Sequence, residues 1–370
     1  MSILAAMAAI AVLAVLIVVH ELGHFLAARL QGIYANRFSL GFGPILWKYQ
    51  GPETEYAVRA IPLGGFVGFP DDDPDSDIPP NDPNLLRNRP ILDRAIVISA
   101  GVIANLVFAY FLLVAQVGLV GTPQDFSYQP GVVVPQVAAE SSSVAKEAGI
   151  KSGDVILAVD GQALGANREA ITVLMQKIQQ SPNKALELKI QRDQQTLSIK
   201  VKPELGQDGK GKIGVQLAPN GKVIRKRTNN ILEAFSSAAA QYQNLTVATV
   251  QGFGQLIRNF RETASQVTGP VGIVDIGAKI ASSDPLSLLQ FAAIISINLA
   301  IINILPLPAL DGGQLIFLLI EGVRGKPLPT EVQQNVMQTG LVLLLGLGIF
   351  LIVRDTANLI PTSWVQNLFQ

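Results

Sequence analysis

The chain has 370 residues, and its 28 basic and 28 acidic side chains give a formal net charge of zero at pH 7. This balance gives no sign of a nucleic-acid partner, and the absence of cysteine excludes a disulfide framework and a thiolate metal site. Hydrophobic residues make up 49% of the chain and charged residues only 15%, and several apolar runs are long enough to span a bilayer. The composition predicts a polytopic α-helical membrane protein that carries a soluble domain.

The first predicted span covers residues 3–28, which are almost entirely Ala, Ile, Leu and Val up to residue 19. It lacks the basic start of a signal peptide and runs on into a polar motif, so we interpret it as a retained span. That motif is His20-Glu21-Leu22-Gly23-His24, which holds the only two histidines of the sequence.

The spacing of this motif is typical of a zinc site. Residues i and i+4 lie on one face of a helix, so His20 and His24 can bind one cation. Glu21 is turned off that face and can act as general base on a water molecule beside the metal. The alternative is a helix with two polar residues packed against its neighbours, but ionisable groups at membrane depth are costly and rarely idle. His20 lies about 13 Å along the helix from Arg29, which predicts a metal inside the membrane near one face.

The first loop, residues 29–92, is predicted to contain a membrane-associated β-hairpin. Residues 55–67 are expected to form a strand, a turn and a short strand. An exposed strand here could receive a peptide by β-strand addition, although a self-contained hairpin is an equal alternative. The candidate substrate-binding residues are Ile61, Pro62, Leu63 and Gly64. The acidic run at residues 71–83 is interpreted as a solvated loop rather than as a metal site.

The middle of the chain changes in character. A second span is predicted at residues 94–120, where Asn105 is expected to hydrogen-bond to a neighbouring helix. Residues 125–220 alternate strand-like runs with turn signals and contain one helical stretch near residues 168–179, which predicts a small α+β domain. Residues 229–264 are expected to be mostly helical and to form an amphipathic connector on the membrane surface.

The last two spans are predicted at residues 286–321 and 337–353. The segment from Asn303 to Gly313 interrupts the first of them, because two prolines and a Gly-Gly pair do not fit a continuous helix. Non-helical backbone at this depth is tolerated only where it is buried in protein or lines a cavity.

A catalytic zinc usually has three protein ligands, and no third histidine exists. Asp311, in an apolar segment beside the break, is the candidate for the third ligand. The alternative is that Asp311 caps the helix that starts at Gly312. Glu321 is a second candidate ligand, although its position suits the membrane interface better.

The predicted organisation has four parts. Residues 1–124 carry the first two spans and the β-loop, residues 125–220 form the inserted domain, residues 221–285 form the connector, and residues 286–370 carry the last two spans. Basic residues in short loops set membrane orientation, and here they place the first loop in the cytoplasm and both termini outside with the inserted domain. These residues are Arg29, Arg37, Lys48, Arg59, Arg87, Arg89, Arg94, Arg324 and Lys326.

The motif at His20–His24, together with the Asn303–Gly313 segment, resembles those of the site-2 protease family of intramembrane metalloproteases, and the regulator-of-sigma-E type in particular. Residues 131–161 look like part of a PDZ domain, of which many enterobacterial relatives carry two. By resemblance, His20, His24 and Asp311 bind Zn²⁺, Glu21 is the catalytic base and Asn303 contacts the substrate backbone. The resemblance also implies regulated intramembrane proteolysis in a bacterial inner membrane, on substrates such as an anti-sigma factor or a remnant signal peptide.

The expected partners are lipid and single-span membrane proteins that another protease has already cut. The PDZ-like domain is expected to lie on the extracytoplasmic side, and the active site near the cytoplasmic face. Two other functional classes remain open. One is an inactive membrane scaffold that presents a PDZ domain, and the other is a metal transporter that uses His and Asp within its spans.

Overall fold

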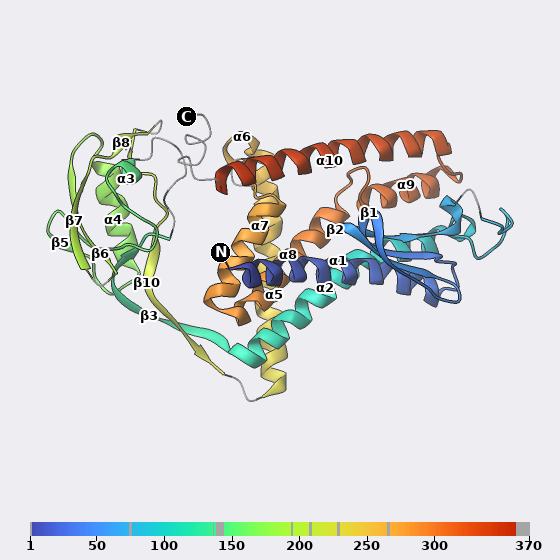
Figure 1. Cartoon of the computed structure of the whole chain (residues 1–370), viewed down its shortest axis with the longest axis horizontal. Coiled ribbons are helices and arrows are strands. Elements are labelled where there is room, and N and C mark those ends of the chain that lie inside the picture. The colour runs from blue at the N-terminus through green and yellow to red at the C-terminus, as the bar shows by residue number, and fades with distance from the viewer. Residues whose placement is uncertain are drawn as a thin grey trace. The chain divides into compact units, whose positions relative to one another are not determined.

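The structure is a computed structural model that describes residues 2–359 except 74–75, 136, 138–143, 194, 207–208, 228–229 and 265–266. The chain divides into two compact units (Figure 1). One unit consists of Met1–Gly121 and Arg227–Gln370, and the other of Thr122–Lys226. The second unit contains the residue range 125–220 in which the sequence predicts a separate α+β domain.

Among the described residues, four helices are long and apolar enough to cross a membrane, as predicted. They are α1 (Ile3–Leu30), α2 (Ile91–Val120), α8 (Leu288–Ile304) with the turn before it, and α10 (Thr330–Leu359). Long apolar runs form helices in lipid because a helix satisfies its backbone polar groups within the segment itself. The fourth helix is longer than the predicted range 337–353.

The predicted break in the third span, at Asn303–Gly313, is confirmed, and the candidate span itself covers Pro285–Ile304 of the predicted range 286–321. The helix α8 ends at Ile304, and the separate helix α9 (Asp311–Arg324) is not among the candidate spans. Leu305 adopts an extended conformation, which is the preference of a residue that precedes proline. Ala309 then takes a positive φ of 68°, so the chain reverses sharply before α9 begins.

Two glycines allow α9 to begin directly against this turn. A Cβ atom on Gly312 would lie 2.1 Å from the carbonyl oxygen of Leu305, and one on Gly313 would lie 2.3 Å from that of Leu307. Only glycine permits so close an approach of two backbone segments. The Gly-Gly pair therefore determines where Asp311, the first residue of α9, is held.

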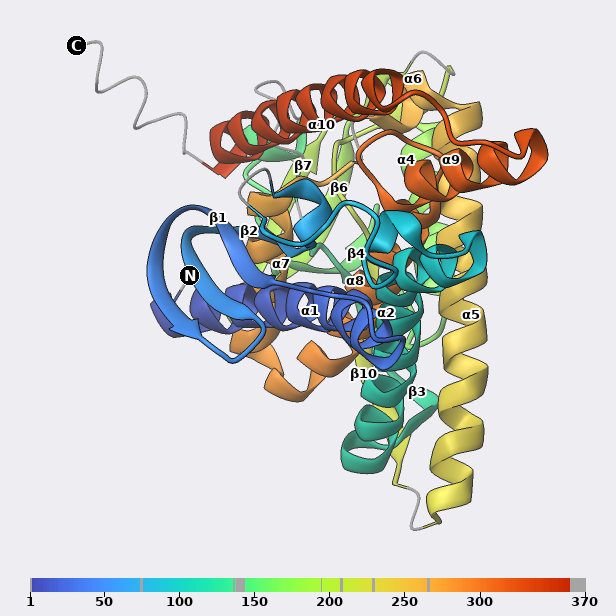
Figure 2. The same ribbon diagram turned by 90° about the vertical axis from the view of Figure 1, so that its right-hand side faces the viewer.

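The second half of α2 packs against α5 (Ile231–Arg258) and α8. Leu113 of α2, Ala238 of α5 and Ile297 of α8 belong to one fully buried cluster. The hydroxyl of Tyr110 donates a hydrogen bond to the Phe235 carbonyl at 3.1 Å. In Figure 2, α2 and α5 run side by side. The helix predicted over residues 229–264 is confirmed by α5 and the short α6 (Phe260–Thr263).

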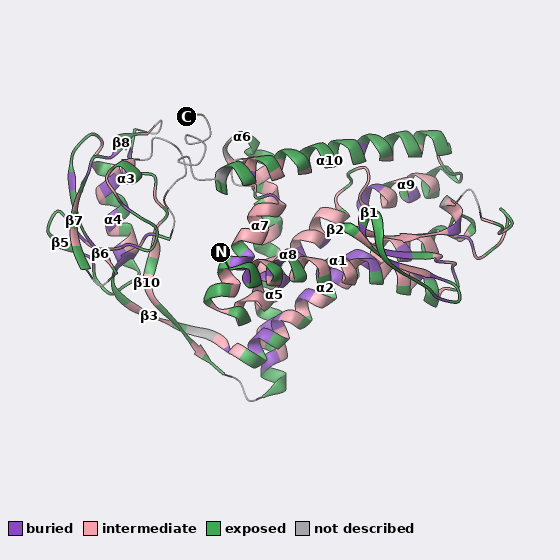
Figure 3. Cartoon of the chain, in the orientation of Figure 1, coloured by how far each residue is buried: buried purple, intermediate pink, exposed green. Residues whose placement is uncertain are grey.

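One buried carboxylate joins α10 to α7 (Pro270–Ser283). Asp355 accepts a hydrogen bond at 2.9 Å from the Gly272 backbone N–H, which is a free donor in the first turn of α7. A Cβ atom on Gly269 would lie 2.7 Å from this carboxylate, which explains a glycine at that position. Nearer its start, α10 touches the α8–α9 turn where Gly340 lies against Pro308. Most of α10 is otherwise exposed (Figure 3).

The first loop forms a small sheet from β1 (Arg37–Gln50) and β2 (Glu55–Gly68), and the predicted strand, turn and strand within residues 55–67 is wrong. β2 is one long strand, and both strands are bent. Residues 37–40 pair in parallel with residues 55–58, and they also pair with residues 65–68 in the opposite direction. No other described strand pairs with residues 65–68, so they form an edge of this sheet.

The unit Thr122–Lys226 is built on a six-stranded sheet with the strand order β10–β3–β4–β6–β7, and β5 pairs with β4. Leu174 and Ile178 of its main helix pack against Leu188 and Ile190 of the sheet. Its strands are β3 (Thr122–Val133), β4 (Val155–Val159), β5 (Gln162–Ala163), β6 (Leu186–Arg192), β7 (Gln195–Val201) and β10 (Ala218–Lys226), with the separate pair β8 (Glu204–Leu205) and β9 (Gly211–Lys212). Its helices are α3 (Val144–Glu147) and α4 (Glu169–Gln180).

A buried ion pair stabilises this unit. Asp154 is 1% exposed, and Arg192 of β6 donates to both of its carboxylate oxygens at 2.7 Å. Burial by itself raises the pKa of Asp154, but the hydrogen bonds from Arg192 and from the Lys151 backbone outweigh it and lower the pKa. The pair therefore stabilises the fold fully above about pH 5, and the stabilisation is lost as the pH falls towards the lowered pKa.

Replacing Arg192 by methionine should destabilise this unit by about 3 kcal/mol, because a buried carboxylate loses its partner. Hydrogen–deuterium exchange of the full chain at neutral pH should show faster exchange in β4 and β6. The variant Lys189→Met, which removes an exposed charge from the same strand, is the control. Equal protection in both variants would contradict a stabilising role for the pair.

Candidate metal centre

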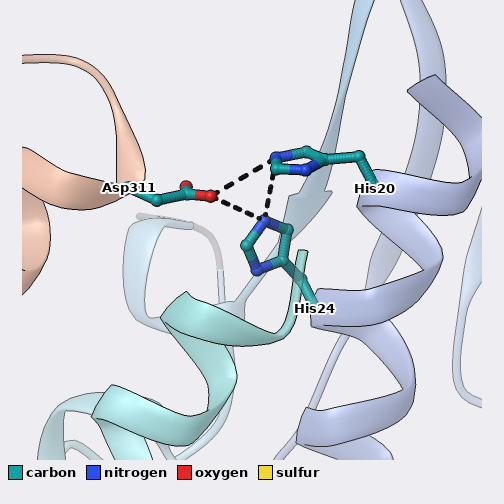
Figure 4. Close-up of side chains that lie close together, drawn as sticks. All are labelled: His20, His24 and Asp311. Carbon is teal, nitrogen blue, oxygen red and sulfur yellow. Dashed lines mark hydrogen bonds and ion pairs between the residues drawn. The ribbon is translucent and has the colours of Figure 1, made fainter. Parts of the chain in front are cut away.

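Two segments far apart in the sequence bring the predicted metal ligands together. His20 and His24 project from one face of α1, and Asp311 projects from the start of α9 (Figure 4). The Nε2 atoms of the two histidines are 3.2 Å apart, and each lies 3.4 Å from Asp311 Oδ2. Ligands about 2.0–2.1 Å from zinc at tetrahedral angles lie about 3.3–3.4 Å from one another. The three atoms therefore have the spacing of three corners of a zinc site.

The hydrogen bonds of His24 leave its Nε2 free to bind a metal. Its Nδ1 lies 2.8 Å from the carbonyl oxygen of Val97 on α2. A carbonyl oxygen only accepts, so Nδ1 carries the hydrogen and the Nε2 lone pair points towards Asp311. Second hydrogen bonds of this kind orient metal-binding histidines in other proteins.

The carboxylate fits a cation as well. Asp311 Oδ2 is buried and has no hydrogen-bond partner among the described residues. Lone pairs from Asp311 and His24 thus face each other in a largely buried space, which is unfavourable unless a positive charge lies between them. The described residues hold one such group of three ligand side chains, and these residues fit a divalent metal ion.

Glu21 lies beside this triangle. It is 9% exposed and lines the same cavity as the two histidines. A Cβ atom on Gly65 of β2 would lie 2.8 Å from Glu21 Cγ and 2.9 Å from the Ser39 carbonyl oxygen. The backbone of β2 therefore runs directly past the candidate base, and glycine at position 65 makes room for it.

The cavity around the triangle has a volume of about 830 Å³. Its lining is apolar at Ile17 and Leu299, and it is polar where Arg94, Gln314 and Gln333 contribute side chains. It thus combines walls that suit an apolar substrate with groups that can hold water.

The structure places the other predicted site residues at different distances from the metal ligands. The Asn303 Nδ2 atom at the end of α8 lies 3.3 Å from His20 Nε2. Ile61 pairs with Phe42, and Pro62 and Leu63 continue β2, but the part of β2 that lines the cavity runs from Gly64 to Val67. The strand segment beside the site is therefore slightly further along the chain than expected.

Two alternatives for the third ligand are resolved by geometry. Glu321 accepts a hydrogen bond from Arg94 at 2.8 Å and does not belong to the group of ligand side chains. The alternative role of Asp311 as a helix cap is wrong, because α9 begins at Asp311 itself and Leu310 occupies the cap position.

The profile described as "Peptidase family M50" matches residues 8–347. The chain belongs to this family, the site-2 proteases. The protein named "Putative zinc metalloprotease all3971" of Nostoc sp. is 66% identical over 98% of this chain and 99% of its own length. Membrane metalloprotease ARASP, chloroplastic, of Arabidopsis thaliana is 50% identical over 95% of this chain and 78% of its own length. Regulator of sigma-W protease RasP of Bacillus subtilis is 28% identical over 93% and 96%, respectively.

These matches make this M50 chain a metalloprotease. Among solved structures, the PDZ domain of the SdrC-like protein from Listeria monocytogenes matches 24% of this chain and 87% of its own. That match has 19% sequence identity and a TM-score of 0.21. The family assignment rests on the sequence matches alone.

The sequence of this M50 protease predicts a hydrogen bond from Asn105 to a neighbouring helix, but it does not reveal the Val97 carbonyl oxygen or place one face of α2 against the histidines. Val97, Gly101 and Asn105 follow one another at intervals of four, so they lie on one face of α2. A Cβ atom on Gly101 would lie 2.3 Å from His24 Nε2 and 2.8 Å from His20 Cε1. The regular spacing could have revealed this face, but the Val97 carbonyl oxygen has no signature in a sequence.

Replacing Gly101 by alanine should lower zinc affinity at least about 10-fold, the scale of changes beside metal ligands. The added methyl group would collide with both imidazoles and displace one of them. The measurement is zinc bound by the purified full chain in competition with a chelator. Gly118→Ala in the same helix, where the structure places no described atom within 4 Å of the new methyl group, should bind zinc like the unaltered protein. Equal affinity in the two variants would contradict the close packing of α2 on the histidines.

Proposed function

We propose that this metalloprotease hydrolyses a peptide bond within the transmembrane segment of single-span membrane proteins, with Zn²⁺ bound by His20, His24 and Asp311. The observation that carries the proposal is the ligand triangle with Glu21 beside it, on a helix apolar and long enough to cross a membrane. A peptidase centre at this position on α1 is accessible to a substrate segment in the bilayer.

The residues of the site divide the chemistry among them. The bound zinc supplies Lewis acidity towards a water molecule and the scissile carbonyl group. Glu21 takes a proton from the attacking water and passes it to the leaving amine. Asn303, 3.3 Å from His20 Nε2, is close enough to the metal site to donate an amide hydrogen to the substrate carbonyl oxygen.

A transmembrane helix must be unwound before it can be cut, because its backbone groups are bonded to each other. The strand β2 supplies alternative partners. Residues 65–68 form a sheet edge, and residues 64–67 line the cavity beside Glu21. We infer that an extended substrate segment adds to this edge along Gly65 to Val67, which places its backbone next to the metal ligands.

From the basic residues of the short loops we infer that the polar part of the cavity lies near the cytoplasmic face. Arg94 begins the second span, and Gln314 and Gln333 lie after the break that follows the third. In the proposed mechanism, water reaches the metal ligands by this route.

The unit Thr122–Lys226 has PDZ domains among its structural neighbours. In the same proposal, this unit lies on the extracytoplasmic side of a bacterial inner membrane. There it screens substrates that another protease has already trimmed.

The variant Glu21→Gln tests the enzymatic proposal. It should bind zinc like the unaltered protein, because the three ligands remain, but its cleavage rate should fall at least about 100-fold with the loss of the base. The measurement is fragment release from single-span proteins reconstituted with the protease in vesicles. Undiminished cleavage by this variant, or an unaltered protein that binds no zinc, would overturn the proposal.

Cysteine cross-linking tests the substrate path, since the chain has no cysteine of its own. In the Glu21→Gln background, Val67→Cys on the sheet edge should cross-link to a cysteine near the scissile bond of a substrate. Leu46→Cys is the control, because Leu46 is 70% exposed but lies in β1 outside the cavity lining. Equal cross-linking at both positions would argue against strand addition at this edge.

A further inference from the structure

The ring nitrogen of His20 that faces away from the ligand triangle has one hydrogen-bonding neighbour among the described residues. This neighbour is Asn105 of α2, whose amide nitrogen lies 3.3 Å from His20 Nδ1. Asn105 is 0% exposed, and its Oδ1 atom has no partner within the described part of the chain. We infer that Asn105 is a positioning residue whose amide oxygen accepts the Nδ1 hydrogen of His20 and keeps Nε2 free for zinc, an inference that rests on the proposed function.

The argument begins with the single hydrogen of a neutral imidazole. It sits on Nδ1 or on Nε2, and only the first tautomer leaves a lone pair on the Nε2 atom of His20 that faces Asp311. A buried N–H group at Nδ1 needs an acceptor, since leaving it unpaired costs about 1–3 kcal/mol. Within hydrogen-bonding distance of Nδ1, Asn105 is the group that the described residues offer.

The amide of Asn105 can supply that acceptor by a rotation of 180° about its terminal bond. The rotation exchanges the oxygen and the nitrogen without moving any other group, and it places the oxygen 3.3 Å from His20 Nδ1. No described group holds the oxygen in its other position, because it has no partner there. In the opposite orientation the N–H group would donate to Nδ1 and impose the tautomer that cannot bind zinc.

Two further contacts agree with this assignment. His24 is oriented in the same way, because its Nδ1–H group donates a hydrogen bond to the Val97 carbonyl oxygen. Val97 lies two helical turns before Asn105 on the same face of α2. The backbone around Asn105 is also fixed, since Ser296 of α8 donates to its carbonyl oxygen at 2.8 Å.

The first experiment reads the tautomer directly. Since the chain has two histidines, labelling histidine with ¹⁵N gives four ring-nitrogen signals from the full-length protein. The spectra are recorded from metal-free protein at alkaline pH, and both histidines should be in the tautomer that carries its hydrogen on Nδ1. Asn105→Leu should shift His20 towards the Nε2-protonated tautomer and leave His24 unchanged. A His20 that keeps Nδ1 protonated in this variant would overturn the inference.

The second experiment measures zinc affinity by chelator competition. Asn105→Leu should weaken zinc binding about 10- to 100-fold, as expected for loss of a hydrogen bond to a metal ligand. Asn105→Asp keeps an acceptor and cannot donate, so it should bind zinc at least as tightly as the unaltered protein. Gln116→Leu is the matched control, because Gln116 is a buried amide of the same helix that pairs with Gln290 and not with a histidine.

The outcomes separate this inference from the proposed function. If the unaltered protein binds no zinc, the proposed metal site fails. If it binds zinc and Asn105→Leu binds it equally well, or if Asn105→Asp loses as much affinity as Asn105→Leu, the site stands and the role of Asn105 is refuted. A loss in Gln116→Leu as large as in Asn105→Leu would also refute it, because the effect would then be one of helix packing.

Discussion

Two imidazoles and a carboxylate are held close together inside an apolar bundle, and the packing of the rest of the first unit depends on keeping them there. Such groups repel unless a cation joins them, so the surrounding helices must fix them closely. Glycines allow this close packing at the points where backbone segments meet around the ligands. A Cβ atom on Gly23 would lie 2.4 Å from the Ala100 carbonyl oxygen, and Gly101, Gly312 and Gly313 permit equally close approaches on either side of the ligands. These glycines therefore allow the close packing that holds the ligands.

The candidate ligands could be predicted because metal-binding residues form a recognisable local pattern in the sequence. His20 and His24 are four residues apart, and Asp311 is an acidic residue in an apolar segment beside a helix break. The supporting groups could be predicted only in part. Asn105 was expected to bond to a neighbouring helix, but its partner depends on the rotation of α2 against α1. The Val97 carbonyl and the backbone at Gly65 act through main-chain position, which residue identity does not encode.

The fold, like the site, could be predicted from the sequence only in part. Spans were predictable because bilayer thickness fixes both their length and their composition. The small sheet was predictable only in part: strand structure was expected within residues 55–67, but β1 contains Gly41, Gly43 and Pro44, residues that normally argue against a strand. These residues accompany a bend: Gly41 has a φ of +83°, and a Cβ there would lie 2.6 Å from the Ile61 carbonyl oxygen. Pairing between distant segments determined the strand, and local propensity did not.

The attachment of α10 at Asp355 has a mechanical consequence. Gln333, which borders the cavity, lies 22 residues before this anchor, a distance of about 33 Å along a straight helix. A tilt of only about 5° about the anchor would carry the helix backbone at Gln333 through about 3 Å, roughly the diameter of a water molecule. Between these two points α10 packs against the α8–α9 turn, where Gly340 lies against Pro308, and the rest of this length is mostly exposed. A change in the angle of α10 would therefore change the width of the passage beside the metal ligands.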